Sequence, residues 1–215
     1  MGEINTWDEF GRTIIRTVKE YKLESILEIG SWDGTGSTQC FIEALRNQPN
    51  PSLVCIELRE ERFSQLVANT REFGWIECKN TTTISSKSLS AETFDDIWTS
   101  RFNKIKNCNK DEAYSWYKSD LELVRKCNAG FLETNNKCFD GVLIDGGEFF
   151  GYAEYRLIKN RTNVIFLDDY YSAYKTNRAA RELLEDPDWT VVAGNRFWRN
   201  GYAVFRRNNF ITWKR

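Results

Sequence analysis

The sequence predicts an α/β fold with a doubly wound, mostly parallel seven-stranded sheet, an antiparallel edge strand and a helical insertion. Short apolar segments alternate along the chain with segments of helical periodicity, as they do where helices connect parallel strands. The last two apolar segments follow each other without a helix between them, which is typical of an antiparallel pair at a sheet edge. The 215 residues can bury one substantial core, so a single domain over residues 1–215 is the simplest organisation.

The strands are predicted where apolar runs end at turn-forming residues. They cover Ser25–Ile29, Ser52–Leu58, Trp75–Lys79, Phe139–Asp145, Thr162–Asp169, Trp189–Ala193 and Tyr202–Arg206. The helices are predicted where apolar residues recur on one helical face, and they cover Thr6–Tyr21, Ser37–Arg46, Arg59–Arg71, Glu148–Lys159 and Lys175–Glu185. Thr6 and Glu9 have the spacing of a capping box, which predicts where the first helix begins.

A charged segment, Ser90–Lys137, interrupts this alternation. Its apolar positions predict two amphipathic helices on either side of the sequence N-C-N-K-D-E. Long insertions are often functional, so a lid or a surface for homo-oligomer formation is one interpretation. Packing over one edge of the sheet is the alternative, and the sequence leaves both open.

The composition limits the classes of function. The formal net charge of −1 gives no basic field that favours nucleic acid as the main partner. The first twenty residues are charged throughout, so they predict neither a signal peptide nor a membrane span, and we expect a soluble, cytoplasmic protein with no membrane partner. Six cysteines without a C-x-x-C pair and the absence of histidine argue against zinc and favour free thiols. A general base must then be a carboxylate, Lys, Tyr, Cys or water.

A glycine-rich turn in Glu24–Ser37, E-S-I-L-E-I-G-S-W-D-G-T-G-S, follows the first strand and opens a helix. Glycine lets the backbone approach a ligand closely, and the free N–H groups of the helix start gather there. The segment therefore predicts a pocket for a small molecule. The spacing G-x-x-x-G-x-G does not fit the dinucleotide pattern G-x-G-x-x-G, and a turn without a ligand is the alternative.

With Glu28 two residues before the first glycine, this segment resembles motif I of the class I S-adenosylmethionine-dependent methyltransferases. The resemblance implies S-adenosylmethionine as cofactor, with the loop around its methionine part and Glu28 helping to orient the amino group. The cofactor-binding residues that we expect are Glu28, Gly30, Ser31, Gly34, Gly36, Ser37, Glu57 and Asp145.

Glu57 follows the second predicted strand. In doubly wound sheets the ligand lies beyond the carboxyl ends of the strands, where an acid can accept both ribose hydroxyls of an adenosyl group. Capping of the next helix is the alternative interpretation of Glu57. The polar stretch Asn80–Ser88 is expected to line the adenine side.

Three aspartates, Asp145, Asp168 and Asp169, fall at the carboxyl ends of two strands that should be neighbours. Carboxylates so close together repel one another and resist ionisation unless a cation compensates them. They therefore predict a site for a hard divalent ion, most simply Mg²⁺. The alternatives are structural: Asp169 can cap the next helix, and Asp145 can stabilise the Gly146–Gly147 turn.

The segments I-D-G-G-E-F-F-G-Y-A-E and I-F-L-D-D-Y resemble the macrocin-type and cephalosporin-hydroxylase-like branch of these methyltransferases. The resemblance implies a Mg²⁺ site at Asp145, Asp168 and Asp169. The branch has D-H after D-G, where this chain has Gly147 and Glu148. Glu148 is the nearest replacement for the missing second aspartate, so Asp145, Glu148 and Asp169 are the candidate catalytic residues, with Glu148 or Asp169 taking the proton.

The combined expectation is an S-adenosylmethionine-dependent, Mg²⁺-dependent O-methyltransferase that acts on a hydroxyl of a small molecule or glycan. A cofactor-binding protein of this fold without transferase activity is one alternative. A nucleic-acid methyltransferase is another, because residues 194–215 contain six basic residues, no acids and interleaved aromatic residues. The chain lacks the N-P-P-Y type of amine-methylating motif, which argues against that last alternative.

Overall fold

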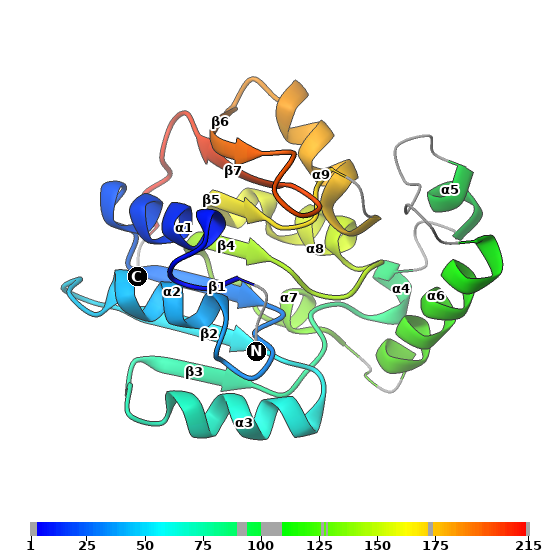
Figure 1. The fold of residues 1–215 in the computed structure, drawn as a ribbon, viewed down its shortest axis with the longest axis horizontal. Helices are drawn as coiled ribbons and strands as arrows, with labels where there is room; N and C mark the ends of the chain where they lie inside the picture. Colours follow the sequence, from blue (N-terminus) through cyan, green and yellow to red (C-terminus); the bar gives the residue numbers. More distant parts are fainter. Residues whose placement is uncertain are drawn as a thin grey trace.

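The computed structural model describes residues 4–89, 94–99, 109–125, 127, 129–171 and 174–213. Seven strands form one sheet in the order β3-β2-β1-β4-β5-β7-β6 (Figure 1). They are β1 (Ser25–Ile29), β2 (Ser52–Ile56), β3 (Ile76–Lys79), β4 (Phe139–Ile144), β5 (Thr162–Leu167), β6 (Trp189–Asn195) and β7 (Tyr202–Arg207). Strands β1 to β5 pair in parallel, and β7 lies antiparallel between β5 and β6. The predicted sheet is confirmed.

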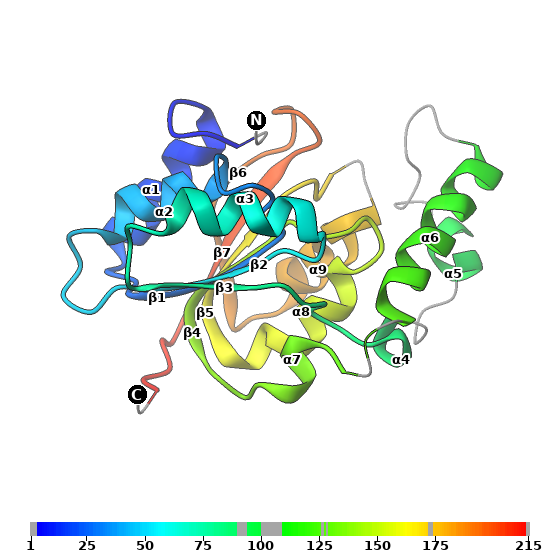
Figure 2. The ribbon, with the colours of Figure 1, turned by 90° about the horizontal axis from the view of Figure 1, so that it is seen from below.

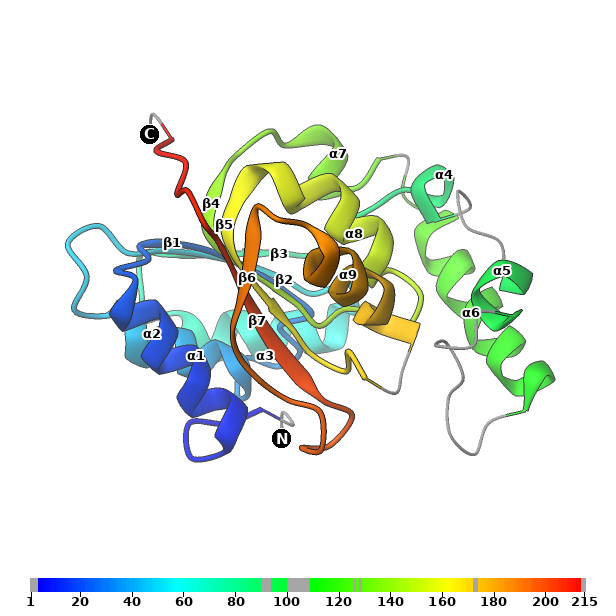
Figure 3. The same ribbon diagram turned by 90° about the horizontal axis from the view of Figure 1, so that it is seen from above.

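Helices cover both faces of the sheet (Figures 2 and 3). One face carries α1 (Glu9–Glu20), α2 (Ser37–Leu45) and α3 (Glu60–Thr70), and the other carries α7 (Phe131–Thr134), α8 (Gly151–Ile158) and α9 (Tyr174–Glu185). A short 3₁₀ helix, η1 (Lys159–Arg161), follows α8. This two-sided covering explains why the parallel strands read as almost continuous apolar runs rather than as an alternating pattern.

The core divides into two apolar clusters, one on each face of the sheet. Successive residues of β1 point to opposite faces, so Ile26 belongs to the cluster under α1 and α2, while Leu27 belongs to the cluster under α8 and α9. At the centre of the first cluster, Phe41 and Phe166 are fully buried with ring centroids 5.9 Å apart. This rigid sheet fixes the positions of the loops at its carboxyl edge.

Several predicted helix boundaries were wrong. The first helix begins at Glu9 with Asp8 as its N-cap, because the Asp8 carboxylate accepts from the backbone N–H of Gly11 at 2.7 Å. The predicted capping box of Thr6 and Glu9 does not form, and Glu9 instead accepts hydrogen bonds from Asn195 and Tyr202. The helix expected from Glu148 begins at Gly151, so Glu148 lies in a loop.

The helix α4 (Ser86–Leu89) directly precedes the insertion, which contains α5 (Phe94–Thr99) and α6 (Lys110–Arg125), and this confirms the two expected helices. Residues 90–93 and 100–108, which include part of N-C-N-K-D-E, lie outside the described residues. The described part packs on the loop after β4, since Phe94 and Tyr117 join Phe149 and Phe150 in a third apolar cluster. It stands beside the carboxyl edge of the sheet (Figure 1). The lid and the oligomer surface stay predictions.

Two further expectations from the sequence concern the cysteines and membrane-spanning helices. Cys40, Cys55, Cys78, Cys127 and Cys138 are free thiols, while Cys108 is outside the described residues. Among the helices that the structure describes, none has the length and apolar character to cross a membrane.

Candidate functional site

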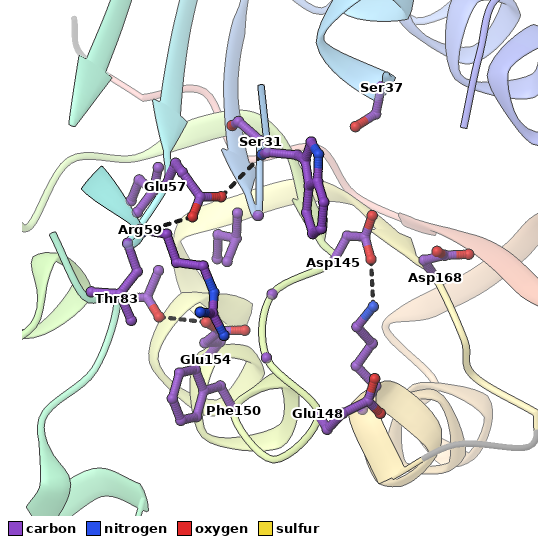
Figure 4. Close-up of a pocket in the computed structure, with 18 of the residues that line it drawn as sticks. Ser31, Ser37, Glu57, Arg59, Thr83, Asp145, Glu148, Phe150, Glu154 and Asp168 are labelled. Atoms are coloured by element: carbon purple, nitrogen blue, oxygen red, sulfur yellow. Dashed lines mark hydrogen bonds and ion pairs between the residues drawn. The ribbon is translucent and has the colours of Figure 1, made fainter. Parts of the chain in front are cut away.

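A cleft of about 570 Å³ opens at the carboxyl ends of the parallel strands (Figure 4). Its wall is formed by the loops after β1, β2, β3, β4 and β5, together with residues of α6, α8 and α9. The size is that of a site for a small molecule or cofactor. The position is the one where doubly wound sheets bind their ligands.

The glycine loop forms one side of this cleft, and its geometry follows from close packing. Gly30 has a φ of +86°, and a Cβ atom there would lie 2.2 Å from the backbone oxygen of Asp145, so only glycine fits between the ends of β1 and β4. Gly34, with a φ of +78°, faces Leu66 of α3 rather than the cleft. Of the expected loop residues, Gly30, Ser31, Gly36 and Ser37 line the cleft and Gly34 does not.

The position of Glu28 differs from the expectation that it orients a cofactor. Its side chain is fully buried and does not line the cleft. The hydroxyls of Ser37 and Thr38 donate to its two carboxylate oxygens at 2.6 and 2.8 Å, and Cys55 Sγ lies 3.3 Å away. Burial raises the pKa of Glu28 in spite of these hydrogen bonds, which lower it. Glu28 therefore ties β1 and β2 to the start of α2.

Glu57 lies at the cleft, directly after β2, and is 6% exposed. One carboxylate oxygen accepts from the backbone N–H of Trp32 at 3.1 Å, and the other accepts from that of Arg59 at 2.8 Å (Figure 4). Arg59 is the N-cap of α3, so Glu57 stands just before that helix and accepts from the N–H of its N-cap residue, while the first turn has no side-chain cap. Each oxygen keeps a second lone pair, so the same carboxylate can still accept from a ligand.

Asp145, Asp168 and Asp169 converge as expected, with ligand oxygens that all lie within 4.8 Å of one another. A residue that the sequence did not indicate stands among them. Lys175 Nζ lies 2.6 Å from Asp145 Oδ1 and 3.1 Å from Asp169 Oδ2, and Lys175 is only 9% exposed. Arg199 Nη2 is 3.7 Å from Asp168 Oδ2. Two cationic side chains of the chain itself thus face the three acids.

The electrostatics of this cluster follow from burial and charge. Burial, followed by repulsion from Asp145 and Asp169, raises the pKa of Asp168 well above its ordinary value. Burial also raises the pKa of Asp145, against the attraction of Lys175. For Lys175, burial lowers the pKa, but the nearby aspartates outweigh it and hold the pKa well above the usual lysine range. Lys175 is therefore a cation at neutral pH.

A second acidic group, Asp120 of α6 and Glu154 of α8, also lines the cleft and was missed by the sequence reasoning. Thr83 Oγ1 donates to Glu154 Oε1, while Glu154 Oε2 and Asp120 Oδ2 are buried without a partner among the described residues. Burial raises the pKa of Glu154 to about 7, and burial and the charge of Glu148 raise that of Asp120 to about 6. Both groups hold protons far more readily than ordinary carboxyls.

The glycines at positions 146 and 147 leave space for the carboxyls of Glu154 and Asp120 beside the loop after β4. A Cβ atom at Gly146 would lie 3.2 Å from Glu154 Oε1, and one at Gly147 would lie 3.2 Å from Asp120 Oδ2. Side chains at these two positions would press on both carboxyls. Glu148 follows in the same loop, half-buried, and burial raises its pKa.

No family model matches the sequence, and no curated protein matches it either. Several solved structures, however, are similar to the structure of this chain. The S-adenosylhomocysteine-bound methyltransferase PaMTH1 of Podospora anserina is 14% identical with a TM-score of 0.58, over 93% of this chain and 78% of that one. An O-methyltransferase from Bacillus cereus in complex with S-adenosylhomocysteine is 14% identical with a TM-score of 0.58, over 93% and 80%. The O-methyltransferase TomG of Streptomyces achromogenes, in complex with S-adenosylmethionine, is 13% identical with a TM-score of 0.56, over 93% and 80%. The chain has the Rossmann-like fold of the class I S-adenosylmethionine-dependent methyltransferases.

Proposed function

We propose that this chain is an S-adenosylmethionine-dependent methyltransferase that methylates a hydroxyl oxygen of a small molecule or sugar. The observation that carries the proposal is a single cleft with the glycine loop and Glu57 on one side and the aspartate cluster on the other. The O-methyltransferases of the same fold that hold this cofactor or its product support it. The resemblance of the D-G and D-D-Y segments to the macrocin-type branch supports a sugar hydroxyl, whereas Gly147 and Glu148, which replace the D-H of that branch, count against it.

The residues present fit the cofactor. The backbone of Gly30 and Gly36 lines the cleft without side chains in the way, and the Glu57 carboxylate keeps lone pairs for ribose hydroxyls. Thr81, Thr82 and Thr83 follow β3 and line the same cleft, as expected for the adenine side. When bound, S-adenosylmethionine supplies an electrophilic methyl group on its sulfonium sulfur.

The chain's own part is to hold the acceptor and to take its proton. Positioning reactants in a near-attack geometry supplies much of such a rate enhancement. A base works best when its pKa lies near the operating pH, and burial moves the pKa of Glu148 in that direction. Asp145, Glu148 and Asp169 all line the cleft, but Lys175 pairs with both aspartates, so Glu148 is the proton acceptor that we favour.

Mg²⁺ is the second part of the sequence-based hypothesis. The three aspartates alone could hold such an ion, because carboxylate oxygens are its preferred ligands. The complete set of residues does not fit a resident ion, since the Lys175 ammonium already bonds two of the three carboxylates. The proposed methyl transfer therefore uses no metal ion.

Calorimetry with S-adenosylhomocysteine, combined with a methyl-release assay on a panel of sugars, polyols and phenols, tests the proposal. We expect micromolar binding and turnover on at least one hydroxyl acceptor. Binding without turnover on the panel would favour the alternative, a cofactor-binding protein without transferase activity, and no binding would refute both. Turnover on nucleic acid only would overturn the choice of a small-molecule acceptor.

A further inference from the structure

Lys175 is the most buried cationic side chain that lines the cleft, with 9% of its surface exposed. It belongs to the first turn of α9, the next helix after the D-D pair that follows β5. A lysine is rarely buried to this extent unless acids pair with it. Here the pairing is double, with Asp145 at 2.6 Å and Asp169 at 3.1 Å.

The Lys175 ammonium lies at the point where a divalent ion would bind. A divalent ion in a carboxylate site stands between the oxygens of its ligands, at bonding distance from each. Lys175 Nζ stands between oxygens of Asp145 and Asp169, which belong to the group whose ligand atoms lie within 4.8 Å of one another. An ion at this point would meet a like charge at close range, so the two cations exclude each other.

The geometry points to Lys175 as the resident cation of the Asp145–Asp168–Asp169 cluster, standing where a divalent metal would stand and presenting its remaining N–H to an oxygen of the acceptor. Two of the three N–H donors of the ammonium reach Asp145 and Asp169. The side chain lines the cleft, so the third donor is available to a ligand there. The role in holding the acceptor rests on the proposed methyl transfer, whereas the exclusion of metal does not.

Arg199 and Asp168 complete the arrangement. Arg199 Nη2 is 3.7 Å from Asp168 Oδ2, so the third aspartate faces a cation of its own. Asp169 Oδ1 is buried without a hydrogen-bond partner among the described residues, which leaves the cluster with unused acceptor capacity. Removal of the lysine charge should thus turn the cluster into an open carboxylate site of the kind that Mg²⁺ and Mn²⁺ prefer.

The experiment is a Mn²⁺ titration of the full chain, with free Mn²⁺ followed by electron paramagnetic resonance. We expect the native protein to bind Mn²⁺ only in the millimolar range and Lys175→Met to bind one ion at least tenfold more tightly. The double variant Lys175→Met/Asp169→Asn should lose that gain. Lys159→Met, which removes a lysine paired with Asp186 outside the cleft, is the matched control and should leave Mn²⁺ binding unchanged.

One tightly bound Mn²⁺ in the native protein, or no gain in folded Lys175→Met, would overturn the inference. Should Lys175→Met not fold, Lys175→Gln and Lys175→Arg replace it: the amide must gain Mn²⁺ affinity and the guanidinium must not. Binding of S-adenosylhomocysteine is measured on the same samples. If the native protein does not bind S-adenosylhomocysteine, the proposed function is refuted, but the Mn²⁺ titration still tests the role of Lys175 in excluding a metal.

Discussion

Substitution of Glu154 by Gln tests the electrostatic description of the cleft most directly. Glu154 is 1% exposed, and burial raises its pKa from 4.5 to about 7. Well below pH 4.5 this carboxyl is protonated in both the folded and the unfolded chain, so its ionisation does not change the free energy of unfolding. As the pH rises to about 7 the unfolded chain releases the proton first, and the folded state loses stability relative to it. From the size of the pKa shift, the loss is about 3 kcal/mol.

Gln keeps the shape of the side chain and an acceptor for Thr83 but has no proton to release. Urea unfolding at pH 4.5, 6, 7 and 8 gives the free energy of unfolding of both proteins. We expect the difference between native protein and Glu154→Gln to shift by about 3 kcal/mol in favour of the variant between pH 4.5 and 8. Glu43→Gln, at an exposed ion pair with Lys19, is the control and should run parallel to the native protein. Parallel profiles for Glu154→Gln would refute the reasoning.

Three further substitutions probe the cofactor side and the core. Glu57→Ala should weaken S-adenosylhomocysteine binding by at least tenfold in calorimetry, since it removes the carboxylate at the cleft; unchanged affinity would contradict its ribose role. Gly30→Ala should lower the melting temperature and abolish that binding, because the new Cβ would lie 2.2 Å from the backbone oxygen of Asp145; a variant with native stability and binding would count against the required close approach. Phe166→Ala, which empties the contact with Phe41, should cost about 3–5 kcal/mol in urea unfolding, and a loss below 1 kcal/mol would show that the core does not depend on it.

The sequence predicted the features that depend on strand order alone. The carboxyl ends of parallel strands meet at one edge, so Asp145, Asp168 and Asp169 could be placed together before any coordinates were known. The same rule placed Glu57 at that edge. Helix starts were less predictable, because Thr6 and Asp8 are both good caps and only the packing of α1 selects Asp8.

The direction of side chains could not be predicted. Glu28 lies in a strand that is buried on both faces, so no alternation of polar and apolar residues reveals whether it faces the cleft or α2. Lys175 and Glu154 sit on helices that approach the cleft from outside the sheet. Their positions depend on how α8 and α9 pack on the sheet, which hydrophobic periodicity does not encode.

Asp145, Asp169 and Glu148, the three candidate bases, are expected to differ in how readily they accept a proton. Asp145 and Asp169 each give a carboxylate oxygen to the Lys175 ammonium, so a proton could reach those oxygens only at the expense of an ion pair. Glu148 has no hydrogen-bond partner within the described residues, and burial raises its pKa. A carboxylate that makes no hydrogen bond to a cation and whose pKa is raised by burial accepts a proton more readily than one bonded to an ammonium group. The pairing of Asp145 and Asp169 with Lys175 therefore favours Glu148 over these two aspartates as the base of the proposed methyl transfer.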